Sequence, residues 1–243
     1  MSKKYKNKLC IYCAQRQSVT GDHIFAREFF LPAQRANLPQ VPTCQECNNE
    51  KSKLEHYLTA LLPFGGRHPD ASENLKIMVP PRLAKNVKLH RTLASSRDRV
   101  FIKEADSAIF QPTTALPIHP DAIEELFGLI LKGLSWYHWN VYFADEHQIQ
   151  VYSLTSFGED FFENRFFKLN AASRVEVNLG NGTVHYEGIQ AQDCAQITVW
   201  RFKLYGGLML AGDPNAPQEQ STQIAAISGP RRCFDDREIK ENS

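Results

Sequence analysis

Two Cys-x2-Cys pairs constrain this chain more than any other feature of its sequence. Cys10 and Cys13 form the first pair, and Cys44 and Cys47 form the second. Thiolates at this spacing suit a tetrahedral Zn²⁺, and in a reducing compartment such pairs favour metal binding over disulfide formation. The sequence therefore predicts one structural zinc site that organises the first part of the chain.

The composition is that of a globular protein. The chain has 243 residues and an apolar fraction of 42%, enough to bury a core without disulfides. It has no run of about 18 apolar residues, and its basic N-terminus lacks the apolar stretch of a secretory signal. We therefore expect a cytoplasmic protein with no membrane partner.

Charge is divided unevenly along the chain. Residues 1–103 contain 18 Lys and Arg against 8 Asp and Glu, whereas residues 104–243 contain 10 against 19. The basic part carries the charge that binding a phosphate backbone requires. The acidic part favours a packed core or a protein partner. We expect nucleic acid to contact the N-terminal part.

Residues 1–66 are predicted to form one metal-organised unit with the order strand, strand, helix. Short strands are expected at residues 18–20 and 40–43. A helix should begin near Asn48, a favoured N-cap residue, and end before Pro63. This order brings both cysteine pairs and the residues between them into one small unit.

The remainder is predicted to comprise a basic connecting layer, residues 67–118, and an α+β domain, residues 119–243. In the layer, residues 75–79 and 100–102 are strand candidates. The domain should begin with a long amphipathic helix and continue with antiparallel strands, including a hairpin that turns at Asn181-Gly182. The elements expected there are a helix from about residue 120, strands at 149–154, 175–179, 184–186 and 197–204, a short helix at 159–168, and a polar tail after residue 213.

Three residues inside the cysteine frame carry side chains suited to phosphodiester hydrolysis. Asp22 and Asn48 offer hard oxygen ligands for Mg²⁺ or Mn²⁺. His23 follows Asp22 directly, so in an extended segment the two side chains point to opposite sides. An imidazole of ordinary pKa is largely neutral at cellular pH, as a general base must be. A cation ligand and a base can therefore flank one phosphate.

The order Cys-x2-Cys, Asp-His, Cys-x2-Cys-Asn-x2-Lys, over residues 10–58, resembles the HNH endonuclease family in its zinc-bound ββα-metal form. The resemblance implies an α+β protein in which a small zinc-stabilised ββα-metal unit precedes the C-terminal domain. It implies a metal-dependent endonuclease that hydrolyses phosphodiester bonds of DNA. The residues that it assigns are Cys10, Cys13, Cys44 and Cys47 to a structural zinc, Asp22 and Asn48 to the catalytic cation, and His23 to activation of water.

Three further positions have supporting roles with open alternatives. The resemblance implies that Lys51 contacts a phosphate or fixes the helix. The family's middle asparagine has one candidate, Asn37, seven residues before Cys44, which either braces the histidine from a longer loop or leaves the brace missing. Glu55 either completes the coordination of the cation, anchors an arginine, or is an ordinary surface residue.

Two other functions remain open at the level of sequence. The chain can be a catalytically inactive zinc-containing module that binds nucleic acid or protein, or a structural subunit that docks onto a partner. The C-terminal part resembles, more faintly, the extensions that follow HNH modules in bacterial proteins, some of them linked to phage defence or mobile elements. Its acidic balance favours a protein partner there.

Overall fold

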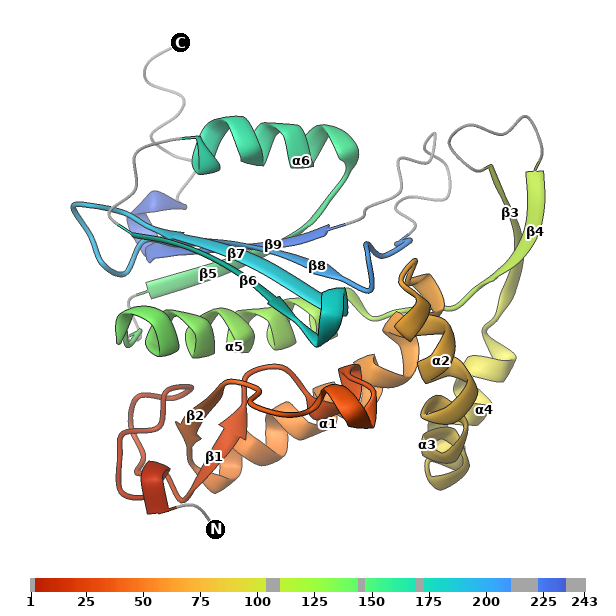
Figure 1. Cartoon of the computed structure of the whole chain (residues 1–243), viewed down its shortest axis with the longest axis horizontal. Coiled ribbons are helices and arrows are strands. Elements are labelled where there is room, and N and C mark those ends of the chain that lie inside the picture. The colour runs from red at the N-terminus through yellow and green to blue at the C-terminus, as the bar shows by residue number, and fades with distance from the viewer. Residues whose placement is uncertain (1–2, 104–109, 144–146, 169–172, 211–222, 235–243) are drawn as a thin grey trace.

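The computed structural model describes residues 3–103, 110–143, 147–168, 173–210 and 223–234 (Figure 1). The described residues form both helices and strands, and every strand pair is antiparallel. The helices are α1 (Gln45–Leu61), α2 (Pro69–Ile77), α3 (Val79–Lys85), α4 (Val87–Ser95), α5 (Pro120–Trp139) and α6 (Ser156–Phe162). The strands are β1 (Thr20–His23), β2 (Gln40–Thr43), β3 (Asp98–Lys103), β4 (Phe110–Ala115), β5 (His147–Leu154), β6 (Ser173–Leu179), β7 (Val184–Gln190), β8 (Thr198–Leu204) and β9 (Gln223–Pro230).

The first unit has the predicted order of strand, strand, helix. β1 pairs with β2 so that Thr20 lies opposite Thr43 and His23 opposite Gln40. The first strand begins at Thr20 rather than residue 18, and α1 begins at Gln45 with Cys44 as its N-cap, three residues before the predicted start. The backbone of Cys44 enters the helix in an extended conformation, so the second cysteine pair itself makes the strand-to-helix turn.

The C-terminal part is built on a five-stranded sheet with the order β5-β9-β8-β7-β6. Figure 1 shows α5 covering one face of this sheet and α6 the other. The predicted turn at Asn181-Gly182 is present, with left-handed φ values of 54° and 101° and a hydrogen bond of 3.2 Å from Thr183 N to Gly180 O. The predicted helix at 159–168 begins earlier, at Ser156, because Thr155 caps it through Gly158 N.

One prediction for this part was wrong. The chain after Asp213 does not end in a polar tail, because β9 runs between β5 and β8 and buries Ile224, Ala225 and Ala226. Residues 211–222 and 235–243 lie outside the described residues. The strand 197–204 ends at Leu204, since Tyr205 has a φ of 48° and Gly206 and Gly207 follow in the left-handed region.

The connecting layer is more helical than predicted. Residues 75–79 were expected to form a strand but lie in α2 and at the start of α3. The ring of His68 caps α2 by accepting from Asp70 N, and prolines occupy the first turns of both helices, so local helix-start chemistry overrides the short apolar run. The second candidate, residues 100–102, lies within β3 as predicted.

α5 lies between the first unit and the five-stranded sheet. Its buried residues belong to one core cluster that also contains Phe25 from the first unit and Trp200 and Phe202 from the sheet. A Cβ on Gly133 would lie 3.1 Å from Ile24, which shows how closely α5 packs on the residues after β1.

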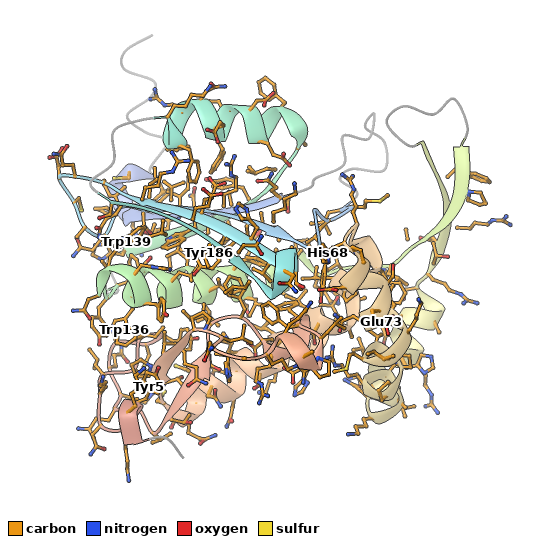
Figure 2. All side chains as sticks on the ribbon, in the orientation of Figure 1. Tyr5, His68, Glu73, Trp136, Trp139 and Tyr186 are labelled. Carbon is orange, nitrogen blue, oxygen red and sulfur yellow. The ribbon has the colours of Figure 1, made fainter. Side chains whose placement is uncertain are left out.

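Aromatic side chains fill the layer between α5 and the sheet. Figure 2 shows Trp139 and Tyr186 there. The Trp139 ring lies 4.8 Å from that of Trp200, and His138 Nε2 lies 3.0 Å from the Tyr186 hydroxyl. The first unit and the sheet are therefore held on opposite sides of one helix.

Within the described ranges, no helix is both long enough and apolar enough to cross a membrane. The chain is thus a mixed helix and strand protein with antiparallel sheets and a cluster of four cysteines near its N-terminus.

Candidate metal centre and the adjoining histidine site

The four cysteine sulfurs meet at one point. All lie within 4.8 Å of one another, and three of the four residues are buried. Four thiolates bound at about 2.3 Å around one zinc would be about 3.8 Å apart, so the cluster can hold a metal ion such as zinc with little adjustment. The residues of this cluster come from the loop before β1 (Cys10, Cys13), the end of β2 (Cys44) and the first turn of α1 (Cys47).

The surroundings of the cluster act differently on its sulfurs, since burial raises the pKa of Cys44 and of Cys47. Burial works against ionisation of Cys13, but backbone hydrogen bonds from Arg16 and Gln15 prevail and lower its pKa to about 6. The Arg16 guanidinium donates to Cys47 Sγ at 3.7 Å, which offsets part of the negative charge of a tetrathiolate site. A metal ion held by the four sulfurs would tie the loop, β2 and α1 together and so fix the position of β1 against the helix.

Asp22 lies on β1 with its carboxylate directed at α1. Its Oδ2 accepts a hydrogen bond of 2.6 Å from the Tyr12 hydroxyl and lies 3.0 Å from Lys51 Nζ. Oδ1 accepts no hydrogen bond from a described residue. No role for Tyr12 was evident from the sequence, although it lies between the first two cysteines. Its hydroxyl connects that part of the chain to Asp22.

Lys51 is buried and makes three contacts. Its ammonium donates to the carbonyl oxygen of His23 at 2.8 Å and to the carboxylates of Asp22 and Glu55. Burial alone would lower the pKa of Lys51, but these two carboxylates raise it, so the side chain stays charged. With 0% of its side chain exposed, Lys51 faces inward and connects α1 to β1 through these contacts.

Glu55 lies one turn further along α1. Burial raises its pKa to about 7, against the opposing effect of Lys51. The carboxylate of Glu55 contacts the ammonium of Lys51, whereas one of the alternatives for Glu55 was a contact with an arginine. The side chain is largely buried, which sets it apart from an ordinary surface glutamate.

His23 points to the other side of β1, as alternation along a strand requires. It is half-buried, and burial lowers its pKa, which favours the neutral imidazole. Its Nε2 lies 2.7 Å from Nε2 of Gln40, the residue directly opposite in β2. This partner could not be predicted from the sequence, because the contact depends on the register of the two strands.

The His23 ring borders a cavity of about 430 Å³. Two basic residues and several polar ones surround it, and Asn37 is among them although it lies seven residues before Cys44. Asn37 is exposed and has a left-handed φ of 58°. The polar residues that line this cavity are His23, Lys4, Arg35, Asn37, Gln40 and Tyr137. A cavity with this lining is suited to an anionic group.

Asn48 lies in the first turn of α1 and is half-buried. Its backbone N–H donates to Cys44 O at 3.1 Å, and its side chain makes no hydrogen bond with the described residues. Lys51, three residues later on the same face of α1, contacts Asp22, so Asn48 lies on the helix face that meets β1. Its amide oxygen is therefore free to take a ligand.

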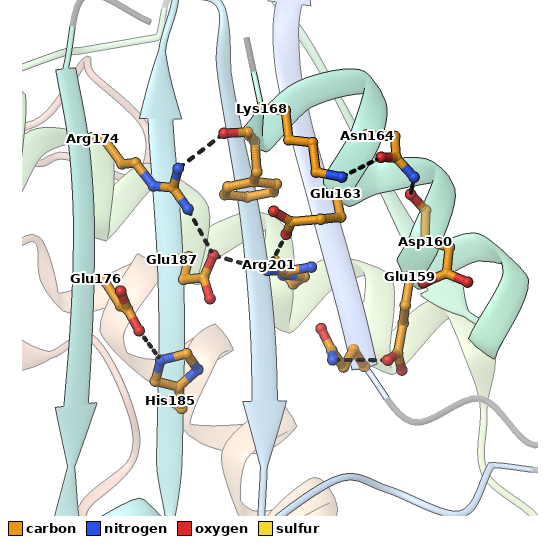
Figure 3. Close-up of polar contacts among 12 residues, drawn as sticks. Glu159, Asp160, Glu163, Asn164, Lys168, Arg174, Glu176, His185, Glu187 and Arg201 are labelled. Carbon is orange, nitrogen blue, oxygen red and sulfur yellow. Dashed lines mark hydrogen bonds and ion pairs between the residues drawn. The ribbon is translucent and has the colours of Figure 1, made fainter. Parts of the chain in front are cut away.

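A second group of metal-ligand type side chains lies on the sheet (Figure 3). Glu176, His185 and Glu187 come within 4.8 Å of one another. His185 already contacts Glu176 at 3.1 Å, and Glu187 accepts from Arg201 at 2.9 Å. These groups are satisfied by one another and by arginine, so the cluster is an ion-pair network of the sheet.

The sequence matches no family model, no curated protein and no solved structure in the comparisons made with them.

Proposed function

We propose that the first unit is the active site of a metal-dependent endonuclease of the HNH type, with DNA as its substrate. The observation that carries the proposal is the divided orientation of Asp22 and His23. One carboxylate faces α1, and the neighbouring imidazole faces a cavity lined by Lys4 and Arg35. A phosphodiester placed at this edge would have a base on one side and cation ligands on the other.

The oxygens suited to the catalytic cation are Asp22 Oδ1 and the side-chain amide oxygen of Asn48. Carboxylate and amide oxygens are the ligands that Mg²⁺ or Mn²⁺ takes in proteins. Such a cation, when bound, stabilises negative charge on the phosphate and its leaving oxygen. Lys51 and the Tyr12 hydroxyl hold Oδ2 of Asp22 and so orient the carboxylate.

His23 would take the proton of the attacking water. Lys51 holds its carbonyl oxygen, which limits the backbone. Gln40 donates to Nε2, the basic nitrogen of the ring, so the amide has to release this nitrogen when the water binds. Asn37 lies at the rim of the same cavity, where it could support the loop that faces His23. In this proposal the structural zinc has no part in the reaction, and the cysteine site serves to place β1 against α1.

A specific experiment tests the catalytic role. Purified protein would be incubated with supercoiled plasmid and Mg²⁺ or Mn²⁺, and nicking compared with that of His23→Ala. Loss of a positioned base typically costs about 10²- to 10⁴-fold in rate, so we expect nicking by the wild type alone. Equal nicking by both proteins, or none by either across both cations, would contradict the proposal.

One observation favours a second candidate, a zinc-containing module that binds nucleic acid without cutting it. The Lys51 ammonium lies 3.0 Å from Asp22, so the carboxylate that would bind the cation is already neutralised in part. In that case His23→Ala would bind DNA as the wild type does and neither would cut it. The plasmid assay combined with a binding measurement separates the two functions.

A further inference from the structure

Residues 79–103 and 110–115, from α3 to the strands β3 and β4, form an arm at the side of the molecule. Figure 1 shows β3 and β4 standing apart from the main sheet, above α3 and α4. Leu93 is the one described residue of α4 that is buried. The arm therefore presents most of its surface to solvent.

This arm carries a concentration of cations. The exposed basic residues are Lys85, Lys88, His90, Arg91, Arg97 and Arg99. Asp98 is the single acidic residue in positions 79–103. Within the described ranges, no salt bridge joins any of these cations to a carboxylate. The charge of the arm is thus available to an external anion rather than consumed by internal pairs.

Arg82, at the start of the arm, anchors it to the rest of the molecule. Arg82 donates from Nη1 to Thr59 O at 3.0 Å and from Nη2 to Glu28 O at 3.1 Å. These contacts tie α3 to the last turns of α1 and to the loop after β1. Asn48 lies at the opposite end of α1. With a rise of 1.5 Å per residue, the helix from Asn48 to Leu61 spans about 20 Å.

We propose that the arm is a binding surface for the phosphate backbone of double-stranded nucleic acid, away from the bond that is cut. Its relation to the reaction site rests on the proposed function, and the length of α1 from Asn48 to Leu61, about 20 Å, corresponds to about six base pairs at 3.4 Å each. The cations recognise phosphate regardless of base sequence, because they lie on an exposed helix and hairpin with free side-chain ends. The duplex would contact the arm and the histidine cavity together.

The test uses the full chain with His23→Ala, which prevents cleavage during binding. The triple variant Lys85→Gln, Lys88→Gln and Arg91→Gln removes charge but retains residues of good helix propensity. A control with the same charge change carries Lys168→Gln, Lys203→Gln and Arg231→Gln, all exposed and on the sheet side. The probes are fluorescent DNA and RNA duplexes of the same sequence and about 30 base pairs, long enough to span several such contacts.

Salt dependence gives the decisive readout. Each phosphate contact adds about 0.9 to the slope of log affinity against log salt, so the arm variant should lose about 2.7 from this slope. Between about 50 and 200 mM salt, the parent should weaken about 40-fold more than the arm variant. The control should keep the parent's slope, and the two duplexes show whether DNA, RNA or both are bound.

The outcomes separate the arm from the proposed chemistry. Equal slopes for the arm variant and the control would overturn the proposal for the arm, even if plasmid nicking is observed. A reduced slope without nicking by the wild type would instead contradict the nuclease and leave the arm as the binding surface. Binding of neither duplex by the parent would overturn the arm as well, and would favour an acidic protein as its partner.

Discussion

Two clusters in this molecule place one cation between carboxylates, and they serve different elements. Lys51 is completely buried and, besides Asp22, holds the main-chain carbonyl of His23. Arg201 lies on the sheet, where it donates to Glu187. Its guanidinium also lies 4.7 Å from the ring centroid of Phe167, in the π-helical turn after α6. The lysine ties β1 to α1, whereas the arginine ties the end of α6 to the sheet.

The two clusters differ in the elements that their cations hold, not in the kind of charge that they contain. The charges around the central cation do not distinguish them, since Lys51 and Arg201 each have two carboxylates at hydrogen-bonding distance. Glu163 completes the sheet cluster and Glu55 the other. What differs is the element that the cation holds in place, and in the first unit that element ends at the histidine cavity. Four changes test this distinction, from the largest expected effect to the smallest.

Loss of the cysteine site should affect one cluster far more than the other. Cys47→Ser removes one of the four sulfurs that could hold a metal. Structural zinc sites contribute about 10–16 kcal/mol of binding free energy in small domains. We expect β1 and α1 to lose hydrogen-exchange protection, while β7 and β8 retain more of theirs. Metal analysis and exchange measured by mass spectrometry would test this.

The control for that experiment is a cysteine outside the cluster. Cys194→Ser should keep both the metal content and the exchange pattern, because Cys194 lies after β7, away from the four sulfurs. Unchanged metal content in Cys47→Ser, or equal loss of protection in β1 and β8, would show that the cysteines do not organise the first unit.

Removing each cation in turn compares the two clusters directly. Lys51→Met leaves two largely buried carboxylates without their partner, which should cost about 3–5 kcal/mol of unfolding free energy. Arg201→Met should cost less, because Glu163 is partly exposed and Arg174 lies 3.7 Å from Glu187 as a second cation. Urea unfolding of the two variants would measure the difference. A larger loss for Arg201→Met would reverse the assignment of the two clusters.

The pH dependence of stability should carry the signature of Glu55. Its pKa is about 7 in the folded protein, mainly through burial, against an ordinary value of 4.5. The folded state therefore keeps this proton over a range in which the unfolded state has lost it. The contribution of Glu55 to the unfolding free energy should fall as pH rises from about 4.5 to about 7, and stay constant above.

Glu55→Gln isolates this contribution. The variant cannot ionise there, so its unfolding free energy should decline less than that of the wild type between about pH 5 and pH 8. Urea unfolding at both pH values measures the two declines. Parallel declines would mean that Glu55 titrates near its ordinary pKa, and that Lys51 compensates its burial in full.

Local signals in the sequence predicted much of the first unit and of the sheet hairpin. The two cysteine pairs imply a common site whatever the rest of the chain does, and Asn181-Gly182 matches the turn that it forms. The strand β9 was missed because its buried stretch is short, contains two alanines and follows a polar segment. Its place in the middle of the sheet depends on partners far away in sequence.

The candidate site shows the same limit. Adjacent residues such as Asp22 and His23 can be assigned to opposite faces of a strand from alternation alone. The burial of Lys51 cannot, because a lysine on a helix is usually exposed, and three acceptors from two elements keep it inside. Gln40 becomes the partner of His23 through the register of β1 and β2. This register cannot be predicted from the position of Gln40 relative to Cys44.

The smallest expected effect concerns the histidine of each cluster. His185 lies beside the carboxylate of Glu176, whereas His23 lies beside the neutral amide of Gln40. An amide N–H donated to Nε2 of His23 keeps the ring proton on Nδ1. Gln40→Met removes this donor with little change in volume, so the ring should also populate the form protonated on Nε2. Stability should change by about 1 kcal/mol or less, the net value of one hydrogen bond.

Nitrogen-15 NMR of the imidazole ring distinguishes the two tautomers of His23 and does not depend on any cleavage assay. Gln45→Met is the matched control, because Gln45 is exposed and bonds Asn49 rather than a histidine. The control should leave the His23 signals in place, whereas Gln40→Met should shift them toward the second tautomer. Identical ring signals in the wild type and Gln40→Met would mean that Gln40 does not orient His23. The carbonyl contact from Lys51 would then be the remaining link between the buried cluster and this histidine.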